Sequence, residues 1–241
     1  MDLGLNGKCA AVAAASAGLG LASAKALAAE GVRVAICGRD RARIEAAASD
    51  VGNGCVPLVA DVSDASGGSA FVAAASEALG GVDILVTNAG GPPAGTFAST
   101  EVDAYPKALD LNLMSVVAMV KGAAPAMVDA GWGRIVAITS ISVRQPIATL
   151  ILSNTARAGV TGFLKTVALE LKDTGVTVNS VQPGLHRTGR VTQLYGTDAD
   201  AMRMGEPDDF GSIVTFVCSD QAKFLTGAQI NVDGGSYQAL Q

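Results

Sequence analysis

Short apolar runs rich in β-branched residues alternate along the chain with longer segments rich in Ala and Leu. This alternation is typical of parallel strands joined by helical crossovers. Strands are predicted over seven runs, Cys9–Ala13, Arg33–Cys37, Cys55–Val59, Ile84–Thr87, Arg134–Ile138, Val176–Val181 and Gln229–Val232. Helices are predicted over six segments, Leu19–Glu30, Arg41–Ser49, Ala65–Leu79, Leu113–Asp129, Ser153–Lys172 and Asp208–Cys218. The pattern predicts an α/β fold, a doubly wound parallel sheet of about seven strands with helices on both faces.

The length and composition suit one domain. The chain has 241 residues, of which 49% are hydrophobic and 16% are charged, enough to bury a large core. We therefore expect residues 1–241 to form a single domain. Only the segment 185–207, rich in Gly, Thr, Asp and Met, lacks a clear pattern, and it follows a predicted strand end. Its position makes it a candidate substrate lid.

Charge and composition exclude several classes of function. A net charge of −5 and a pI near 4.8 argue against a nucleic-acid surface. The four cysteines are scattered singly and His186 is the single histidine, so no metal site is predicted. The first residues lack a basic start followed by an apolar run, and no apolar stretch approaches the roughly 20 residues that span a bilayer. We expect a soluble, cytoplasmic protein with no membrane partner.

A glycine-containing turn follows the first predicted strand, in the segment AAASAGLGLASAKAL. Gly18 and Gly20 would let the backbone approach a pyrophosphate at a helix N-terminus, where free amides point outward. Arg39 follows the second predicted strand, where an arginine pairs with a 2′-phosphate and an acidic residue would bind a free 2′-hydroxyl. The pattern favours NADP(H) over NAD(H) in a Rossmann-type fold. The alternatives are an Ala- and Gly-rich helix start and a solvated surface arginine.

Further short motifs stand at strand or helix ends, and each alone is a common turn or cap. In chain order they are Asp61-Val62, Asn88-Ala89-Gly90, Asn112 in DLNLMS, Thr139-Ser140 and Pro183-Gly184. Together, in this order, they resemble the short-chain dehydrogenase/reductase family across nearly the whole chain. The segment GEPDDFGSIVTFVCSDQAKFLTGAQINVDGG, residues 205–235, resembles the C-terminal signature of 3-oxoacyl-acyl-carrier-protein reductases of that family.

The resemblance implies a nicotinamide cofactor site and assigns its parts. By that resemblance Ser16, Gly18 and Leu19 line the phosphates, Asp61 and Val62 the adenine, Asn88, Ala89 and Gly90 the adenosine ribose and central sheet, and Pro183 and Gly184 the nicotinamide. It also implies that Asn112 and Ser140 orient a carbonyl and a water in catalysis. A small-molecule carbonyl or alcohol is the implied substrate. The implied assembly is a homodimer or homotetramer formed through the helices near Leu113–Asp129 and Ser153–Lys172.

The glycine turn contains a first departure from the family pattern. The family usually has a Thr-Gly pair where this chain has Ala13 and Ala14. Alanine fits at position 14 if the local φ angle is negative, although its methyl group takes space near the phosphates. Ala14 therefore belongs to the predicted cofactor site and is expected to weaken it.

The second departure concerns proton transfer. The family has a tyrosine thirteen residues after Ser140 and a lysine four residues later, and this chain has Ser153 and Arg157. Their spacing still puts both side chains on one helix face. A serine hydroxyl is shorter and far less acidic than a tyrosine, and Arg157 keeps its charge but cannot shuttle protons as lysine can. We expect Asn112, Ser140, Ser153 and Arg157 to be the catalytic residues, with a water on Ser153 and Arg157 delivering the proton and Arg157 also bonding the nicotinamide ribose.

Three functions are compatible with these residues. The first is an NADP(H)-dependent oxidoreductase with this non-standard proton path. The second is a cofactor-binding protein without redox turnover, a sensor or partner subunit, for which the missing tyrosine and lysine argue. The third is non-redox chemistry resembling the halohydrin dehalogenases, relatives that pair tyrosine with arginine but lack the nucleotide-binding turn. Tyr195 and His186 in the candidate lid are weaker substitutes for the missing acid. An aromatic side chain in such a segment more often packs, and His186, two residues after Pro183-Gly184, is more often near the cofactor than catalytic.

Overall fold

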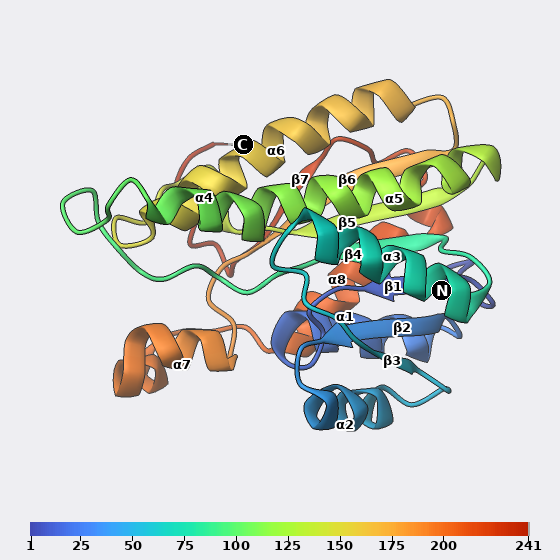
Figure 1. The fold of residues 1–241 in the computed structure, drawn as a ribbon, viewed down its shortest axis with the longest axis horizontal. Helices are drawn as coiled ribbons and strands as arrows, with labels where there is room; N and C mark the ends of the chain where they lie inside the picture. The colour runs from blue at the N-terminus through green and yellow to red at the C-terminus, as the bar shows by residue number, and fades with distance from the viewer. Residues whose placement is uncertain (241) are drawn as a thin grey trace.

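The computed structural model describes residues 1–240 as one parallel sheet between two layers of helices (Figure 1). The seven strands follow the order β3-β2-β1-β4-β5-β6-β7, and every neighbouring pair is parallel. Their bounds are β1 Cys9–Val12, β2 Arg33–Gly38, β3 Val56–Val59, β4 Ile84–Thr87, β5 Gly133–Ile138, β6 Val176–Pro183 and β7 Gln229–Val232. The strand order reverses between β1 and β4, which is where open α/β sheets form a binding crevice.

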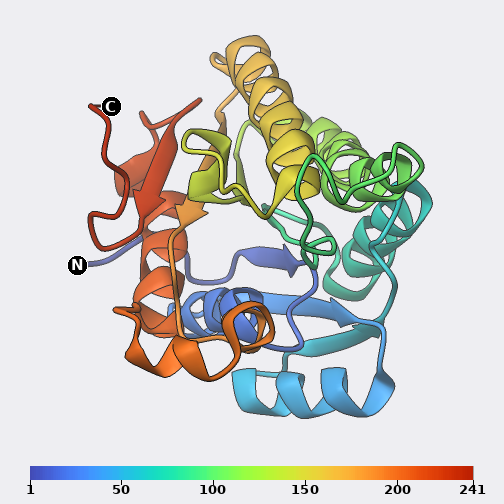
Figure 2. The same cartoon turned by 90° about the vertical axis from the view of Figure 1, so that its left-hand side faces the viewer.

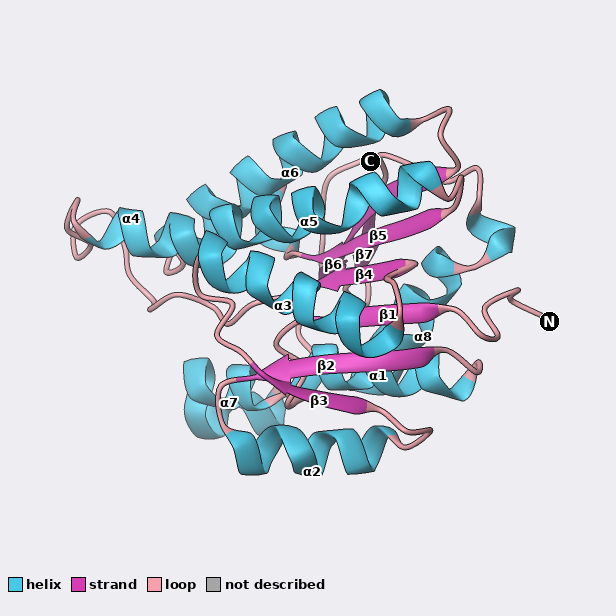
Figure 3. Cartoon of the chain, turned by 45° about the vertical axis from the view of Figure 1, so that its right-hand side comes forward, coloured by secondary structure: helices cyan, strands magenta, loops and turns pink. Residues whose placement is uncertain are grey.

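Helices cover both faces of this sheet (Figure 3). One core cluster joins the sheet to α3 Ala65–Leu79, α5 Ser115–Asp129 and α6 Ile151–Leu171. The other joins it to α1 Gly18–Ala29, α2 Arg41–Val51 and α8 Pro207–Cys218. The shorter helices are α4 Ala104–Leu109 and α7 Gly189–Tyr195. The expected doubly wound α/β fold is confirmed.

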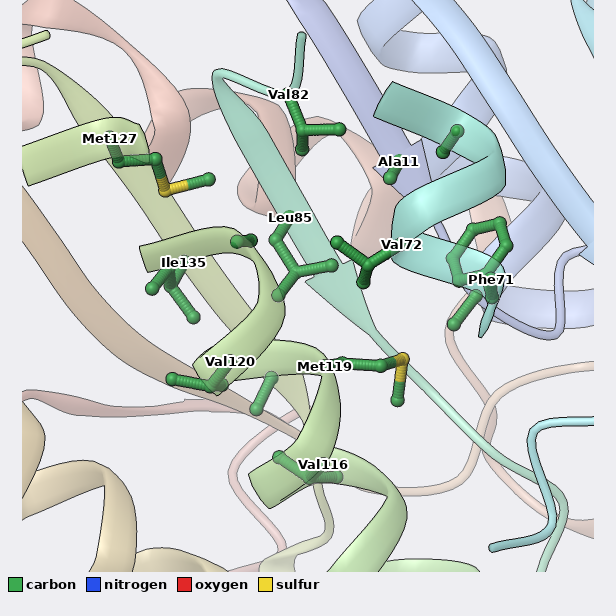
Figure 4. Packing of buried hydrophobic residues seen from close by; sticks show 14 of the residues in the cluster. Ala11, Phe71, Val72, Val82, Leu85, Val116, Met119, Val120, Met127 and Ile135 are labelled. Carbon is green, nitrogen blue, oxygen red and sulfur yellow. The ribbon is translucent and has the colours of Figure 1, made fainter. Parts of the chain in front are cut away.

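The first cluster shows how the sheet is held (Figure 4). Val72 of α3 lies beside Leu85 of β4, and Val120 of α5 lies near Ile135 of β5, while Phe71 of α3 lies toward Ala11 of β1; all of these side chains are buried. Strands buried on both faces are apolar at nearly every position, which is why their runs are continuous in the sequence rather than alternating. This packing fixes the strand ends that carry the candidate site.

The predicted strands and most predicted helices match the structure to within two residues, and one region differs. The helix expected over 113–129 extends back through a π-helical segment, Asp110–Met114, to α4. Such π segments are rare and are frequent at functional sites, and this one contains Asn112. The unpatterned segment 185–207 also contains a short helix, α7, that was not predicted.

The expectation about apolar stretches was wrong. The continuous helical run Ala104–Asp129 is long and apolar enough to cross a membrane by length and composition alone. Core helices of soluble proteins pass the same test, and Val116, Met119 and Val120 of this run are buried against the sheet. The apolar content of this run therefore has a structural explanation in the core.

The turn after β1 is strained at Ala14. Its φ angle is +46°, so the condition under which alanine would fit there is not met. For L-residues this left-handed conformation costs about 1–2 kcal/mol. The turn is held in place because the Ala14 amide donates to Cys37 Sγ (3.4 Å) and its carbonyl accepts from Asn88 Nδ2 (3.1 Å). The neighbouring Ala13 is buried and is not in this strained region.

We expect Ala14→Gly to stabilise the fold by about 1 kcal/mol, because relief of the left-handed strain exceeds the extra chain entropy of glycine. The matched control is Ala13→Gly, which relieves no strain and should destabilise by a similar amount. Urea denaturation of both variants measures the effect. A destabilised Ala14→Gly variant would contradict the strain at this turn.

Candidate functional site

The N-terminus of α1 is open to an anion. The residue before the helix, Ala17, provides no side-chain cap, whereas Asp40 and Asp64 cap α2 and α3 through their carboxylates. The first-turn amides of a helix need acceptors, and the positive end of its dipole attracts negative charge. Gly18 and Leu19 lie in this turn, so its geometry suits the pyrophosphate of a dinucleotide.

Two glycines keep the backbone of this turn accessible. A Cβ on Gly20 would lie 2.9 Å from the Ala14 carbonyl oxygen and 2.9 Å from Asn88 Nδ2, so a side chain there would break the contact between the turn and β4. Gly18 has a φ of +59°, and a Cβ on it would lie 3.6 Å from the Thr188 side chain. Thr188 comes from the candidate lid and was not predicted from the sequence.

The adenosine side of the predicted site lies at the ends of β2 and β3. Arg39 follows β2 and is exposed, and the Ser16 side chain lies beside Gly38 at the end of the same strand. Asp61 is exposed, and its carboxylate accepts a bond from the backbone two residues further on (3.1 Å). Val62 is buried in the core, so only its backbone is available to a ligand.

Ser153 and Arg157 lie in α6 at the end of β5. Arg157 Nε donates to Ser153 Oγ at 3.2 Å, and Arg157 Nη1 donates to the carbonyl oxygen of Ile138, the last residue of β5, at 3.0 Å. The shared helix face expected from the i, i+4 spacing is confirmed. Burial, and then the nearby charge of Arg190, lower the pKa of Arg157 to about 10. Arg157 therefore stays protonated at neutral pH.

Ser140 and Asn112 have defined partners close to the same strand ends. Ser140 Oγ accepts from the backbone amide of Ser142 at 3.1 Å, and Asn112 Nδ2 donates to the Gly90 carbonyl at 3.0 Å. Several buried side-chain oxygens near the ends of β4 and β5 have no partner among the described residues, namely Thr87 Oγ1, Asn112 Oδ1, Thr139 Oγ1 and Ser142 Oγ. Buried polar atoms are usually paired, so these oxygens indicate a polar ligand or bound water at this edge.

Pro183 and Gly184 end β6 on the same edge of the sheet. The Gly184 amide donates to the Val232 carbonyl at 3.0 Å, and a Cβ on Gly184 would lie 2.7 Å from Asp233 Cβ. His186 follows, buried edge-to-face against Phe210 with ring centroids 5.4 Å apart. Its Nδ1 lies 3.3 Å from the Gly184 carbonyl oxygen. These contacts show that His186 packs in the interior of the fold.

The segment 185–207 stands on the side of the sheet to which the strands point, and Figure 2 shows α7 from that side. Its base is closed by backbone bonds between Leu185 and Gly205 (3.0 Å) and between Arg187 and Gly205 (2.9 Å). Further out, Arg190 Nη2 donates to the carbonyl of Pro92, which follows β4, at 2.8 Å. The segment therefore contacts the glycine turn through Thr188 and the β4 loop through Arg190.

Sequence reasoning missed Thr188 as a member of the site, although Thr188 stands only four residues after the Pro183-Gly184 motif. Arg190 lies in the candidate lid, where its positive charge already indicates an anionic substrate from the sequence. Its contact with Pro92 gave no signal in the sequence, because Pro92 is 98 residues away in the chain. Among the described residues, no tyrosine hydroxyl forms a hydrogen bond with Ser140, Ser153 or Arg157.

Curated relatives share the length of this chain. The bovine (Bos taurus) dehydrogenase/reductase SDR family member 4 is 32% identical over 249 residues, covering 98% of this chain and 89% of its own. The 3-oxoacyl-acyl-carrier-protein reductase FabG of Vibrio cholerae is 31% identical over 242 residues, covering 98% of this chain and 99% of its own. The similarity thus extends over nearly the whole domain.

Solved structures give the same result. L-sorbose reductase from Gluconobacter frateurii, complexed with NADPH and L-sorbose, is 29% identical with a TM-score of 0.92 and covers 100% of both chains. The NADPH-bound short chain oxidoreductase from Pseudomonas aeruginosa PAO1, described as containing an atypical catalytic center, is 31% identical with a TM-score of 0.88. That similarity covers 97% of this chain and 98% of the other.

The family described as Enoyl-(Acyl carrier protein) reductase matches residues 13–237, from the glycine turn to the C-terminal tail. The match begins directly after β1 and includes the other six strands, with the strand ends on which the site is built. Together with the fold and the relatives, it shows that this chain belongs to the short-chain dehydrogenase/reductase family of oxidoreductases.

Proposed function

We propose that this chain is an NADP(H)-dependent oxidoreductase acting on a carbonyl or alcohol, with a proton path through Ser153 and Arg157 in place of the usual tyrosine and lysine. The observation that carries the proposal is the hydrogen bond from Arg157 Nε to Ser153 Oγ at the carboxyl end of β5. It keeps a hydroxyl and a fixed positive charge in contact at the strand ends where the family performs its chemistry.

The residues present fit the cofactor. The uncapped first turn of α1 suits its pyrophosphate, and exposed Arg39 suits the 2′-phosphate that distinguishes NADP(H). When bound, the cofactor supplies or accepts the hydride. The NADPH complexes of the sorbose reductase and of the atypical Pseudomonas enzyme support the choice of NADP(H). Asn88, Ala89, Gly90, Pro183 and Gly184 are proposed to hold the riboses and the nicotinamide.

The two serines are proposed to bind the reacting oxygen of the substrate. Ser140 Oγ accepts from the Ser142 amide and Ser153 Oγ accepts from Arg157, so each hydroxyl keeps its own hydrogen for donation. Two such donors would orient a carbonyl and stabilise the negative charge that develops on its oxygen during hydride transfer. Asn112, anchored on Gly90, leaves Oδ1 available to hold a water.

Arg157 is proposed to act through its charge rather than as an acid. Its pKa of about 10 keeps it protonated near neutrality, so the proton delivered to the substrate comes from Ser153 or from a water that Ser153 and Arg157 hold. The guanidinium stabilises the serine oxygen while that proton is away. A missing general acid typically lowers the rate by about 10²–10⁴, so we expect slow turnover compared with family members that have the tyrosine.

A binding protein without redox turnover is the second candidate. The short Ser153 side chain and the strained Ala14 turn favour it, because both features weaken catalysis or cofactor binding in a fold that still suits the ligand. In this case the purified protein would bind NADPH and convert none of a broad panel of carbonyls.

The proposed assembly is a homodimer or homotetramer in the cytoplasm, since members of this family are commonly oligomeric. The two glycines of α6 differ in what they face. A Cβ on Gly159 would lie 3.2 Å from Leu113 of the same chain, whereas Gly162 is exposed and faces no atom within 4 Å. Gly162 is therefore the glycine that suits contact with a second copy.

We expect Arg39→Ala to weaken NADPH binding about tenfold to a hundredfold, because a charge-assisted bond to the 2′-phosphate is lost. NADH binding should change little. Arg41→Ala is the control, since Arg41 is exposed nearby and pairs with Glu45. The change in cofactor fluorescence on binding measures the affinity of the wild-type protein, Arg39→Ala and Arg41→Ala for NADPH and NADH. Equal loss of NADPH and NADH affinity would contradict this assignment of Arg39.

We expect Arg157→Ala to abolish turnover in a folded protein and Ser153→Ala to lower kcat about 10²- to 10⁴-fold. Thr155→Ala is the control on the same helix, because Thr155 is exposed and bonds only the Ile151 carbonyl. NADPH oxidation with a carbonyl substrate measures kcat, and thermal unfolding checks the fold. Unchanged turnover in Arg157→Ala would exclude the proposed proton path.

A further inference from the structure

Arg190 is fixed at the edge of the candidate site by contacts with the β4 loop. Its Nη2 donates to the buried Pro92 carbonyl at 2.8 Å, and its Nη1 donates to Gln193 at 3.0 Å. The guanidinium lies so close to Gly91 that a Cβ there would be 2.7 Å from Nη2 and 2.9 Å from Cζ. Gly91 therefore leaves the space that the Arg190 guanidinium occupies, and any larger residue at position 91 would clash with it.

Arg157 of α6 is anchored at the end of the neighbouring strand. Its guanidinium donates to Ile138, the last residue of β5, while Arg190 donates to Pro92 in the loop after β4, and these two strands are paired through Thr87 and Ala137. Burial, and then the charge of Arg190, lower the pKa of Arg157, which agrees with the placement of both cations at this edge of the sheet. Both are partly buried.

Neither cation has a carboxylate partner among the residues that the structure describes. The ion pairs in residues 1–240 are Lys25–Asp50, Arg41–Glu45, Arg134–Asp220 and Arg187–Glu206. Two like charges that lie close together and partly out of water destabilise each other unless an anion lies between them. Each guanidinium has five N–H donors, and Arg157 and Arg190 each use two of them in the bonds described here.

We propose that Arg157 and Arg190 together bind a carboxylate of the substrate, so that the protein acts on oxo acids, or the corresponding hydroxy acids, in preference to neutral carbonyls. This inference rests on the oxidoreductase function proposed above and names its substrate class. Because Arg157 also bonds Ser153, the carboxylate would lie close to the hydroxyl that serves the reacting oxygen. Arg190 belongs to the segment 185–207, so it is a specificity-determining residue of the candidate lid.

The phosphates of the cofactor are the other source of negative charge near these residues. They have donors of their own, since the pyrophosphate suits the α1 N-terminus beside Thr188 and the 2′-phosphate suits Arg39. Arg190 is instead fixed to the loop after β4, on the same edge as Asn112 and the unpartnered oxygen of Thr87. The geometry therefore favours the substrate as the source of the anion.

The test uses 2-oxobutanoate, 3-oxobutanoate and the methyl esters of both acids. Each is titrated into the cofactor-free protein and into its complex with NADP⁺, in which no reduction can occur, with thermal stabilisation as the readout. NADPH oxidation then gives kcat/KM for the same four compounds. We expect the acids to bind more tightly than the esters. Arg190→Gln should lower this preference about tenfold to a hundredfold, in binding and in kcat/KM.

Arg187→Gln is the matched control, because Arg187 lies in the same segment but is exposed and paired with Glu206. It should keep the preference for acids, and Arg190→Lys should keep part of it. Three results overturn the proposal. These are no binding of either acid, equal binding of acids and esters, or an Arg190→Gln variant that loses NADP⁺ affinity instead, which would assign the pair to cofactor phosphate.

Failure of the proposed function gives a different result. A protein that binds neither NADPH nor NADP⁺ contradicts the oxidoreductase proposal, while titration of the acids into the cofactor-free protein still tests the arginine pair. Conversely, selective NADPH binding with turnover of the esters but not of the acids would support the oxidoreductase and reject the oxo acid.

Discussion

Parallel pairing of all seven strands brings their carboxyl ends to one edge of the sheet, and the candidate site depends on this alignment. Asn88 follows β4, Arg157 is anchored on the last residue of β5, and Gly184 follows β6. These residues are far apart in the sequence and adjacent in space only because the strands share one direction. The buried packing of Phe71, Leu85 and their neighbours keeps that edge rigid.

Several positive groups gather at this edge, beside carboxylates such as Asp61. The first turn of α1, Arg39, Arg157 and Arg190 all present positive charge or free donors, although the whole chain carries a net charge of −5. Such a local excess attracts anions and strengthens as the site excludes water. The same property suits the phosphates of the proposed cofactor, the proposed oxyanion and the proposed acidic substrate.

The sequence pattern predicted the sheet well because each strand is a separate apolar run. Ile84–Thr87 and Gln229–Val232 were predicted to the residue. The π segment around Asn112 could not be predicted, since its hydrogen-bond shift leaves no pattern of residue types. The helix α7 was missed because the segment 185–207 has few apolar residues with helical spacing.

Within the site, the sequence predicted which residues replace the tyrosine and lysine and that they share a helix face. The sequence could not predict the φ angle of Ala14, because the surrounding turn determines the backbone conformation there. The structure shows that this angle is positive. The sequence pattern also could not predict contacts between segments that are far apart in the chain. Thr188 beside Gly18 and Arg190 on Pro92 depend on how the segment 185–207 folds back over the sheet.

Hydride transfer itself is the most direct measurement. The protein would be incubated with NADPH deuterated at C4 of the nicotinamide and with carbonyl compounds that include oxo acids, and the alcohol products analysed by mass spectrometry. An oxidoreductase that uses Ser153 and Arg157 predicts deuterium on the carbinol carbon of at least one product, and none with Arg157→Ala. If NADPH binds but the deuterium stays on the cofactor with every carbonyl, the chain is a binding protein and the proposed catalysis is wrong.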